Sequence, residues 1–244
     1  MALTALFVTA ISVTSFIEIA DAMTEADGQA FDHQVLALLR PYADDPGRPW
    51  GPGWLKEAAA DITSLGGIAV LGLFALIVIV FLLSQRKWLS SLLLALGLAG
   101  GVMLSEGLKA VFERERPPQL MQAVETTNAS FPSGHALLAT VFYLSVAVML
   151  TRAFPRPGFK IFVLGVGMVM ALLVGLTRIY LGAHWATDVF AGWAAGSAWA
   201  MALWLAAYGI ARWQKRRRAP LQDEPSPIEP ETPEPPSIDD PTKV

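Results

Sequence analysis

Six stretches of the chain contain no Asp, Glu, Lys or Arg and approach the length that a membrane crossing requires. A helix rises about 1.5 Å per residue, so the shorter stretches need flanking residues to cross a hydrocarbon core of about 30 Å. The pattern predicts an all-α integral membrane protein with six transmembrane helices. The predicted spans are residues 2–17, 62–85, 88–105, 136–151, 161–177 and 189–211.

The composition of the 244 residues supports a membrane location, since 54% are hydrophobic and 16% are charged. The net charge of -3 provides no basic surplus for binding nucleic acid. The chain has no cysteine, which excludes disulfides, thiolate nucleophiles and cysteine-ligated metals.

The first span has an alternative interpretation, because Ala20, Asp21 and Ala22 resemble a cleavage site after the apolar core of a secretory signal. The basic segment that normally precedes such a core is missing, which favours a retained transmembrane helix. Cleavage would leave five spans.

The orientation follows from the lysines and arginines next to the spans, which concentrate on the cytoplasmic side. Ten of the 18 basic residues lie between spans two and three, between spans four and five, and after span six. These segments share one side, which we expect to be cytoplasmic. Loops 106–131 and 178–188 then lie on the periplasmic or extracellular face.

The segment between the first two spans contains an apolar stripe at helical spacing, followed by two tryptophans. An interfacial amphipathic helix with an aromatic anchor and a packed outer cap explain this pattern equally well. Either would border the entrance for a lipid. The stripe is Phe31, Val35, Leu38 and Leu39, and the tryptophans are Trp50 and Trp54.

The end of the chain differs in composition, with eight prolines and seven acidic residues in residues 219–244. Such a segment cannot bury a core, and we expect a disordered cytoplasmic tail. The basic run before it is typical of a topology anchor. The predicted organisation is therefore a first helix with an outer segment (1–61), a transmembrane core (62–212) and a basic anchor with the tail (213–244).

Three groups of polar residues occur where spans end. The first is Lys109 with Arg116 and Pro117, after span three. Two cations there are compatible with simple membrane anchoring, and Glu113, Arg114 and Glu115 could form local ion pairs.

The second group is Pro132, Ser133, Gly134 and His135, at the start of span four. A helix start offers free backbone N–H groups and a positive dipole end, which together favour an anion. Ordinary capping by Ser133 is the alternative. His135 favours the anion site, because it can donate a proton to the bound group.

The third group is Thr177 and Arg178 followed by His184 and Asp188. A spacing of four puts His184 and Asp188 on one helix face, so the carboxylate can accept the Nδ1 proton and leave Nε2 as a nucleophile or base. An interfacial His184 next to Trp185, with Asp188 as a helix cap, is the alternative.

All three groups are predicted on the outer face, around four consecutive spans. A bundle of these helices would form one pocket with two histidines and several cations. Such a pocket suits a phosphate-like dianion, whose charge must be neutralised before a nucleophile approaches.

The ordered set Lys-x6-Arg-Pro, Pro-Ser-Gly-His and Arg-x5-His-x3-Asp resembles the type 2 phosphatidic acid phosphatase superfamily, which also contains vanadium haloperoxidases. The resemblance extends from Lys109 to Gly192 at the level of motifs. It departs from the family pattern at Thr177, where serine is usual.

The resemblance implies that His184 attacks phosphorus and becomes a phosphohistidine, that Asp188 orients it, and that His135 protonates the leaving oxygen. We expect a metal-independent reaction with no cofactor, because two-metal phosphoryl transfer needs clustered carboxylates, whereas the acids of the outer loops lie next to arginines and Asp188 is committed to His184. Arg114 and Glu106 match no motif position and are interpreted as structural. The phosphoryl oxygens would be held by Lys109, Arg116, Ser133, Gly134 and Arg178.

The sequence therefore predicts a lipid phosphatase embedded in the bilayer, with a membrane lipid as partner and no nucleic acid. Phosphate transfer to another lipid is the nearest alternative, and a vanadate-dependent haloperoxidase or a transporter is more distant. The resemblance suggests undecaprenyl diphosphate, phosphatidylglycerophosphate, phosphatidic acid or a lipid A phosphate as substrate.

Overall fold

The computed structural model describes residues 2–124, 126, 128–154 and 156–218. The chain divides into two units, Met1–Tyr208 and Gly209–Val244, and the helix bundle belongs to the first. The predicted tail, residues 219–244, lies outside the described residues.

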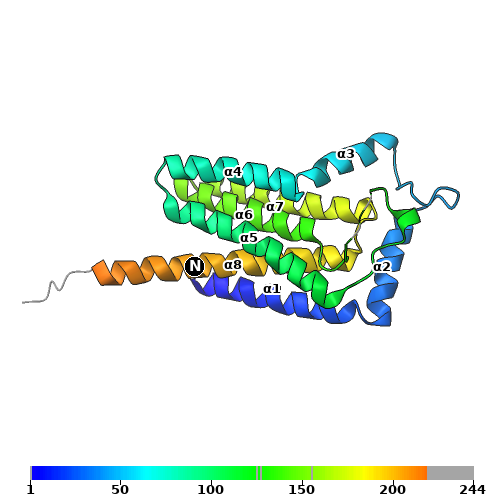
Figure 1. Ribbon diagram of the computed structural model, residues 1–244, viewed down its shortest axis with the longest axis horizontal. Coiled ribbons are helices and arrows are strands. Elements are labelled where there is room, and N and C mark those ends of the chain that lie inside the picture. The colour runs from blue at the N-terminus through cyan, green and yellow to red at the C-terminus, as the bar shows by residue number, and fades with distance from the viewer. Residues whose placement is uncertain (1, 125, 127, 155, 219–244) are drawn as a thin grey trace, which may run out of the picture. The chain divides into compact units, whose positions relative to one another are not determined.

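The described residues form α-helices, one short 3-10 helix and no strand. The helices α4 to α7 and the part of α8 up to Tyr208 run side by side within the first unit (Figure 1). In chain order the elements are α1 (Ala2–Ala22), α2 (Ala26–Leu38), α3 (Gly53–Ser64), α4 (Ile68–Ser84), α5 (Trp88–Phe112), η1 (Gln119–Met121), α6 (Gly134–Ala153), α7 (Pro157–Tyr180) and α8 (Ala186–Arg218).

Five of these helices, α1, α5, α6, α7 and α8, are long and apolar enough to cross a membrane. A sixth span is obtained if α3 and α4, which meet at an angle of 48°, are taken together. The predicted all-α multi-pass membrane architecture is confirmed.

The prediction of one continuous second span over residues 62–85 was wrong in its boundaries, because the chain breaks between Ser64 and Ile68. A Cβ atom on Gly66 would lie 2.3 Å from the Val174 side chain and 3.3 Å from the carbonyl oxygen of His135. The break therefore occurs where the chain passes very close to α6 and α7.

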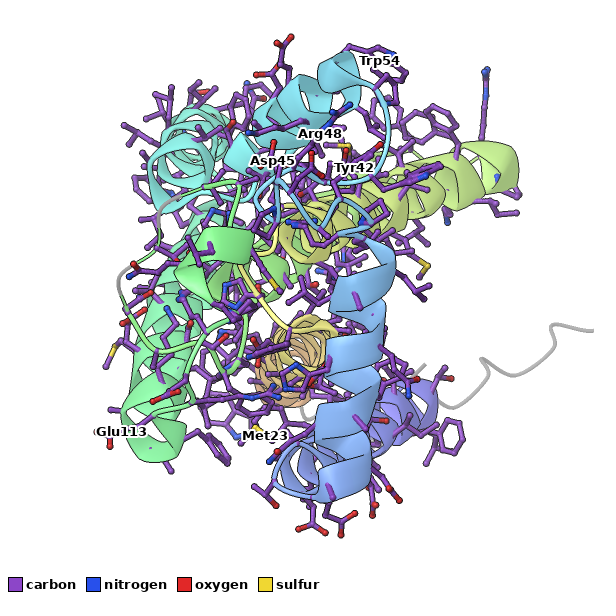
Figure 2. The ribbon with its side chains drawn as sticks, turned by 90° about the vertical axis from the view of Figure 1, so that its right-hand side faces the viewer. Met23, Tyr42, Asp45, Arg48, Trp54 and Glu113 are labelled. Carbon is purple, nitrogen blue, oxygen red and sulfur yellow. The ribbon has the colours of Figure 1, made fainter. Side chains whose placement is uncertain are left out.

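The segment before this break packs against one end of the bundle, as the alternative of an outer cap predicts, and it leaves other apolar side chains exposed. Val35 and Leu39 pack against a buried cluster that includes Ile179 and Val189, and α2 crosses the end of the helices (Figure 1). On its other side, Leu38 is 77% exposed, and Trp54 projects outward from α3 (Figure 2).

The core of the bundle is a cluster contributed by α4, α5, α6 and α8. Outward-facing side chains such as Phe81 and Ile161 are exposed and apolar, as expected for helices surrounded by lipid. The buried members of the cluster are Leu71, Ala75, Leu94, Leu137, Leu138, Val141, Phe142 and Ala195.

Two glycines of α8 allow it to lie directly against the backbone of α6. A Cβ atom on Gly192 would lie 2.6 Å from the Ser133 carbonyl oxygen, and one on Gly196 would lie 2.7 Å from that of Leu137. Small residues with this spacing let membrane helices approach closely. The approach brings the beginnings of α6 and α8 together.

Gly192→Ala is expected to lower the free energy of unfolding by about 1–3 kcal/mol, because the new methyl group overlaps a backbone carbonyl that cannot move independently. Gly165→Ala on α7 is the control, since a Cβ there meets nothing within 4 Å. Thermal unfolding in detergent compares the two. Equal stability of both variants would show that the approach of α6 and α8 tolerates a side chain.

Candidate active site

A cavity of about 290 Å³ opens at the end of the bundle where α5 and α7 end and α6 begins. Residues from both predicted outer loops line it, which confirms that these loops share one end of the molecule. The lining residues are Gly66, Ile68, Val102, Ser105, Glu106, Lys109, Arg116, Thr126, Asn128, Gly134, His135, Leu138, Arg178 and His184.

Six of the eight predicted site residues line this cavity: Lys109, Arg116, Gly134, His135, Arg178 and His184. The other two lie behind it. Ser133 is fully buried, and its hydroxyl caps α6 by accepting from the Ala136 N–H at 3.5 Å. Asp188 is fully buried behind His184.

His184 lies in the tight connection between α7 and α8. Gly182 has a φ of +68°, and a Cβ there would lie 2.4 Å from the Met121 carbonyl oxygen, so this turn requires glycine. The Nε2 atom of His184 is 3.2 Å from an Arg116 nitrogen. Because a guanidinium only donates, Nε2 accepts and Nδ1 carries the proton.

That Nδ1 proton points toward Asp188, with 3.4 Å between Nδ1 and Oδ2. The same carboxylate oxygen accepts from the Trp185 N–H at 2.9 Å and from the Ser130 hydroxyl. The other oxygen accepts from Arg114 at 2.6 Å. Asp188 is therefore fixed on both sides, and the predicted pairing with His184 is present.

Burial lowers the pKa of His184 from 6.5 to about 4. Asp188 acts in the opposite direction, while the positive charges of Arg116 and Arg178 lower the pKa further. The imidazole is therefore neutral at physiological pH and presents an unprotonated Nε2 to the cavity.

The cations of the cavity differ in how far the protein already occupies their donors. Arg116 donates to the Asn128 carbonyl and side-chain oxygens and to the Ala183 carbonyl, each at 2.6 Å. Burial lowers its pKa, and the nearby Asp188 partly offsets this. Lys109 pairs with Glu106 at 2.9 Å.

Arg178 is 6% exposed and has unused hydrogen-bonding capacity. Its Nε atom has no partner among the described residues, and one terminal nitrogen donates to Thr63 at 3.4 Å. A buried donor without a partner is costly. An anion in the cavity would satisfy it.

The sequence interpretation missed Ser105, which lies one helical turn before Lys109 on α5. Ser105 is 2% exposed, and its hydroxyl has no hydrogen-bond partner within the described part of the chain. Other helical hydroxyls, such as those of Ser91 and Thr140, bond to the carbonyl four residues earlier. The spacing of four residues between Ser105 and Lys109 was the signal available in the sequence, because it puts both side chains on one face of the helix.

The suggested local ion pairing of Glu113, Arg114 and Glu115 was wrong. Glu113 takes a left-handed conformation at the end of α5 and points away from the helices (Figure 2). Arg114 turns inward and pairs with Asp32 and Asp188. The reversal of direction at Glu113 separates neighbouring charges that sequence proximity had suggested would pair.

The lowered pKa of His184 predicts a specific pH dependence of stability. Between pH 4 and 6.5 the unfolded chain binds a proton that native His184 does not, so this contribution is complete above pH 6.5 and is lost as the pH falls toward 4. We expect the unfolding temperature of the wild type to fall more steeply over this range than that of His184→Gln.

The control is His33→Gln, because His33 is exposed. It shows how far the replacement of any histidine by glutamine changes the unfolding temperature. Parallel slopes for the wild type and His184→Gln would show that His184 is not held neutral by burial.

Two curated relatives are similar to this chain. Phosphatidylglycerophosphatase B of Bacillus subtilis is 35% identical over 144 residues, which cover 59% of this chain and 70% of that protein. An undecaprenyl-diphosphatase of Sulfolobus acidocaldarius is 36% identical over 101 residues, which cover 39% of this chain and 45% of that protein.

Solved structures show the same architecture. The crystal structure of a transmembrane PAP2 type phosphatidylglycerolphosphate phosphatase from Bacillus subtilis superimposes with a TM-score of 0.74 at 28% identity, covering 86% of this chain and 98% of that one. Aquifex aeolicus LpxE, at 22% identity and a TM-score of 0.53, shares the fold over 70% of this chain and 93% of its own. The sequence pattern that defines the PAP2 superfamily matches residues 88–212, and the chain belongs to that superfamily.

Proposed function

We propose that this multi-pass membrane protein is a metal-independent phosphatase that hydrolyses a lipid phosphomonoester or diphosphate through a phosphohistidine on His184. The observation that carries the proposal is the placement of His184, whose ring lines a cationic cavity while its Nδ1 lies 3.4 Å from the buried carboxylate of Asp188. The family and the two named phosphatase relatives support it.

In the first step, Nε2 of His184 attacks phosphorus, and the bond from phosphorus to the lipid oxygen breaks. Asp188 stabilises the positive ring that forms. His135, on the cavity wall at the start of α6, gives a proton to the departing oxygen. Water then attacks the phosphohistidine, His135 takes up a proton, and phosphate leaves with His184 restored.

The negative charge that develops on the phosphoryl oxygens requires donors on several sides. Lys109, Arg116 and Arg178 supply positive charge from three different segments. Ser133 and Gly134 place the positive end of the α6 dipole at the cavity. Ser105 adds a hydroxyl to the same wall.

The rest of the cavity supports a lipid substrate. Ile68, Val102 and Leu138 continue its wall, and the helices around it have exposed apolar surfaces. The head group would enter the cavity while the chains remain in the bilayer. Phosphatidylglycerophosphate is the first candidate, because the relative with the broader coverage is named for that activity. The positive-inside pattern supports an outer-face site and a cytoplasmic tail.

The first test measures phosphate release by the purified protein in detergent, with EDTA present, from phosphatidylglycerophosphate, phosphatidic acid and undecaprenyl diphosphate. We expect release by the wild type and a loss of at least about 10,000-fold for His184→Ala, because the covalent route is removed. His33→Ala, which changes an exposed histidine, should retain activity.

With a lipid whose phosphate is labelled on phosphorus, the phosphohistidine should leave acid-labile label on the wild-type protein. His184→Ala should carry no such label. Equal release by His184→Ala, or complete inhibition by EDTA, would contradict the proposal. Labelled phosphate recovered on a second lipid instead of in water would identify a phosphotransferase.

Ser105→Ala tests the added phosphate contact. We expect the inhibition constant of inorganic phosphate to rise about 10-fold or more, because a hydrogen bond to a charged group is lost. Ser91→Ala is the matched control, since Ser91 lies on the same helix and its hydroxyl already bonds to the carbonyl of Lys87, the residue before the helix. Unchanged inhibition in Ser105→Ala would place this hydroxyl outside the phosphate site.

A further inference from the structure

Arg114 bridges two buried carboxylates that come from distant parts of the chain. One terminal nitrogen donates to Asp188 Oδ1 at 2.6 Å and to the Thr187 hydroxyl at 2.7 Å. The other donates to Asp32 Oδ2 at 2.7 Å. Asp32 is 2% exposed and Asp188 is fully buried, so the guanidinium neutralises charge that water cannot reach.

Asp32 also holds the beginning of α8 from outside that helix. Its Oδ1 accepts from the Thr187 backbone N–H at 3.0 Å, and its Oδ2 accepts from the Thr187 hydroxyl. A carboxylate at a helix N-terminus satisfies a free N–H group and is favoured by the dipole. Asp32 therefore fixes both Arg114 and the first turn of the helix that carries Asp188.

We propose that Asp32 and Arg114, together the Asp32–Arg114 bridge, are positioning residues that hold Asp188 in register with His184. The proposal rests on the proposed role of His184 as nucleophile. Arg114 is the partner of Asp188 Oδ1, while Ser130, Trp185 and His184 share Oδ2. Loss of Arg114 leaves one buried oxygen without this donor and allows the carboxylate to rotate away from the ring.

A buried ion pair alone contributes little to stability, because desolvation of the charges opposes their attraction. The bridge concentrates its hydrogen bonds on Asp188 and Thr187, adjacent to the site. Asp32 also lies on α2, outside the matched family region 88–212. The orientation of the catalytic pair therefore depends on a helix that precedes that region.

The bridge lies on the side of His184 away from the substrate cavity. Neither Asp32 nor Arg114 lines that cavity, and both line a separate hollow with His33 and Trp185. Removal of the bridge should therefore change the chemical step and leave lipid binding intact. This distinction separates positioning from substrate contact.

The test compares Asp32→Asn, Arg114→Gln and the double variant in lipid phosphate hydrolysis. We expect kcat to fall about 10- to 100-fold in each single variant, as for other groups that orient a catalytic residue indirectly, with KM within about 2-fold of the wild type. The double variant should be no slower than Arg114→Gln, because both changes break one chain of contacts.

Asp27→Asn is the matched control, because Asp27 is exposed on the same helix. Arg114→Lys retains the charge but not the two-sided geometry, and its kcat should lie between those of Arg114→Gln and the wild type. Unfolding temperatures verify that each variant folds; if Arg114→Gln does not fold, Arg114→Lys and Asp32→Asn give the comparison. Unchanged kcat, a raised KM with normal kcat, or multiplicative losses in the double variant would overturn the proposal.

Nitrogen NMR of labelled histidine separates failure of the bridge from failure of the proposed function. In the wild type, His184 should show a protonated Nδ1 and an unprotonated Nε2, and the Asp32→Asn variant should show a mixture of tautomers. If the wild type releases no phosphate, the proposed function fails, yet the spectrum still tests the bridge. A His184 signal unchanged in Asp32→Asn would overturn the bridge even in an active enzyme.

Discussion

The close approach of α6 and α8 is the constraint on which the site depends. Gly192 and Gly196 remove the side chains that would separate the two backbones, and the Ser133 N–H donates to the Asp188 carbonyl at 2.9 Å where the helices begin. Two positive helix ends therefore meet at one point. This arrangement favours an anion on the α6 side, and a buried carboxylate occupies the corresponding place on the α8 side.

Buried charge then determines how the surrounding segments fold. Asp188 is fully buried, and an ionised carboxylate in that position requires donors on every side. Those donors come from the loop after α5, which contains Arg114 and Ser130, and from the turn before α8. Arg114 in turn donates to Asp32 on α2. Segments that would otherwise be ordinary surface connections are thus held against the end of the bundle by a single acid.

Much of this organisation was predictable from the sequence, because it follows from local patterns. Uncharged stretches located the membrane helices, and the spacing of four between His184 and Asp188 suggested their pairing. The pairing is present, although His184 lies in the turn before α8 begins at Ala186. The break at Gly66 and Gly67 was not predictable, since it depends on the proximity of His135 and Val174. Asp32 gave no signal either, because its partners lie 82 and 155 residues away and no periodicity connects them.

The cations near His184 affect its ring differently before and after an anion enters the cavity. Burial is the main cause of the lowered pKa of the His184 ring, and Arg116 and Arg178 lower this pKa further, which favours an unprotonated Nε2 before an anion enters. When a phosphate group enters, its negative charge offsets these cations and removes part of that effect. In the proposed reaction, the ring would then more readily carry the positive charge that forms as Nε2 bonds to phosphorus, and Asp188 would stabilise that charge from the other side. Binding of an anion therefore changes the electrostatics of the site in the direction that the proposed reaction requires.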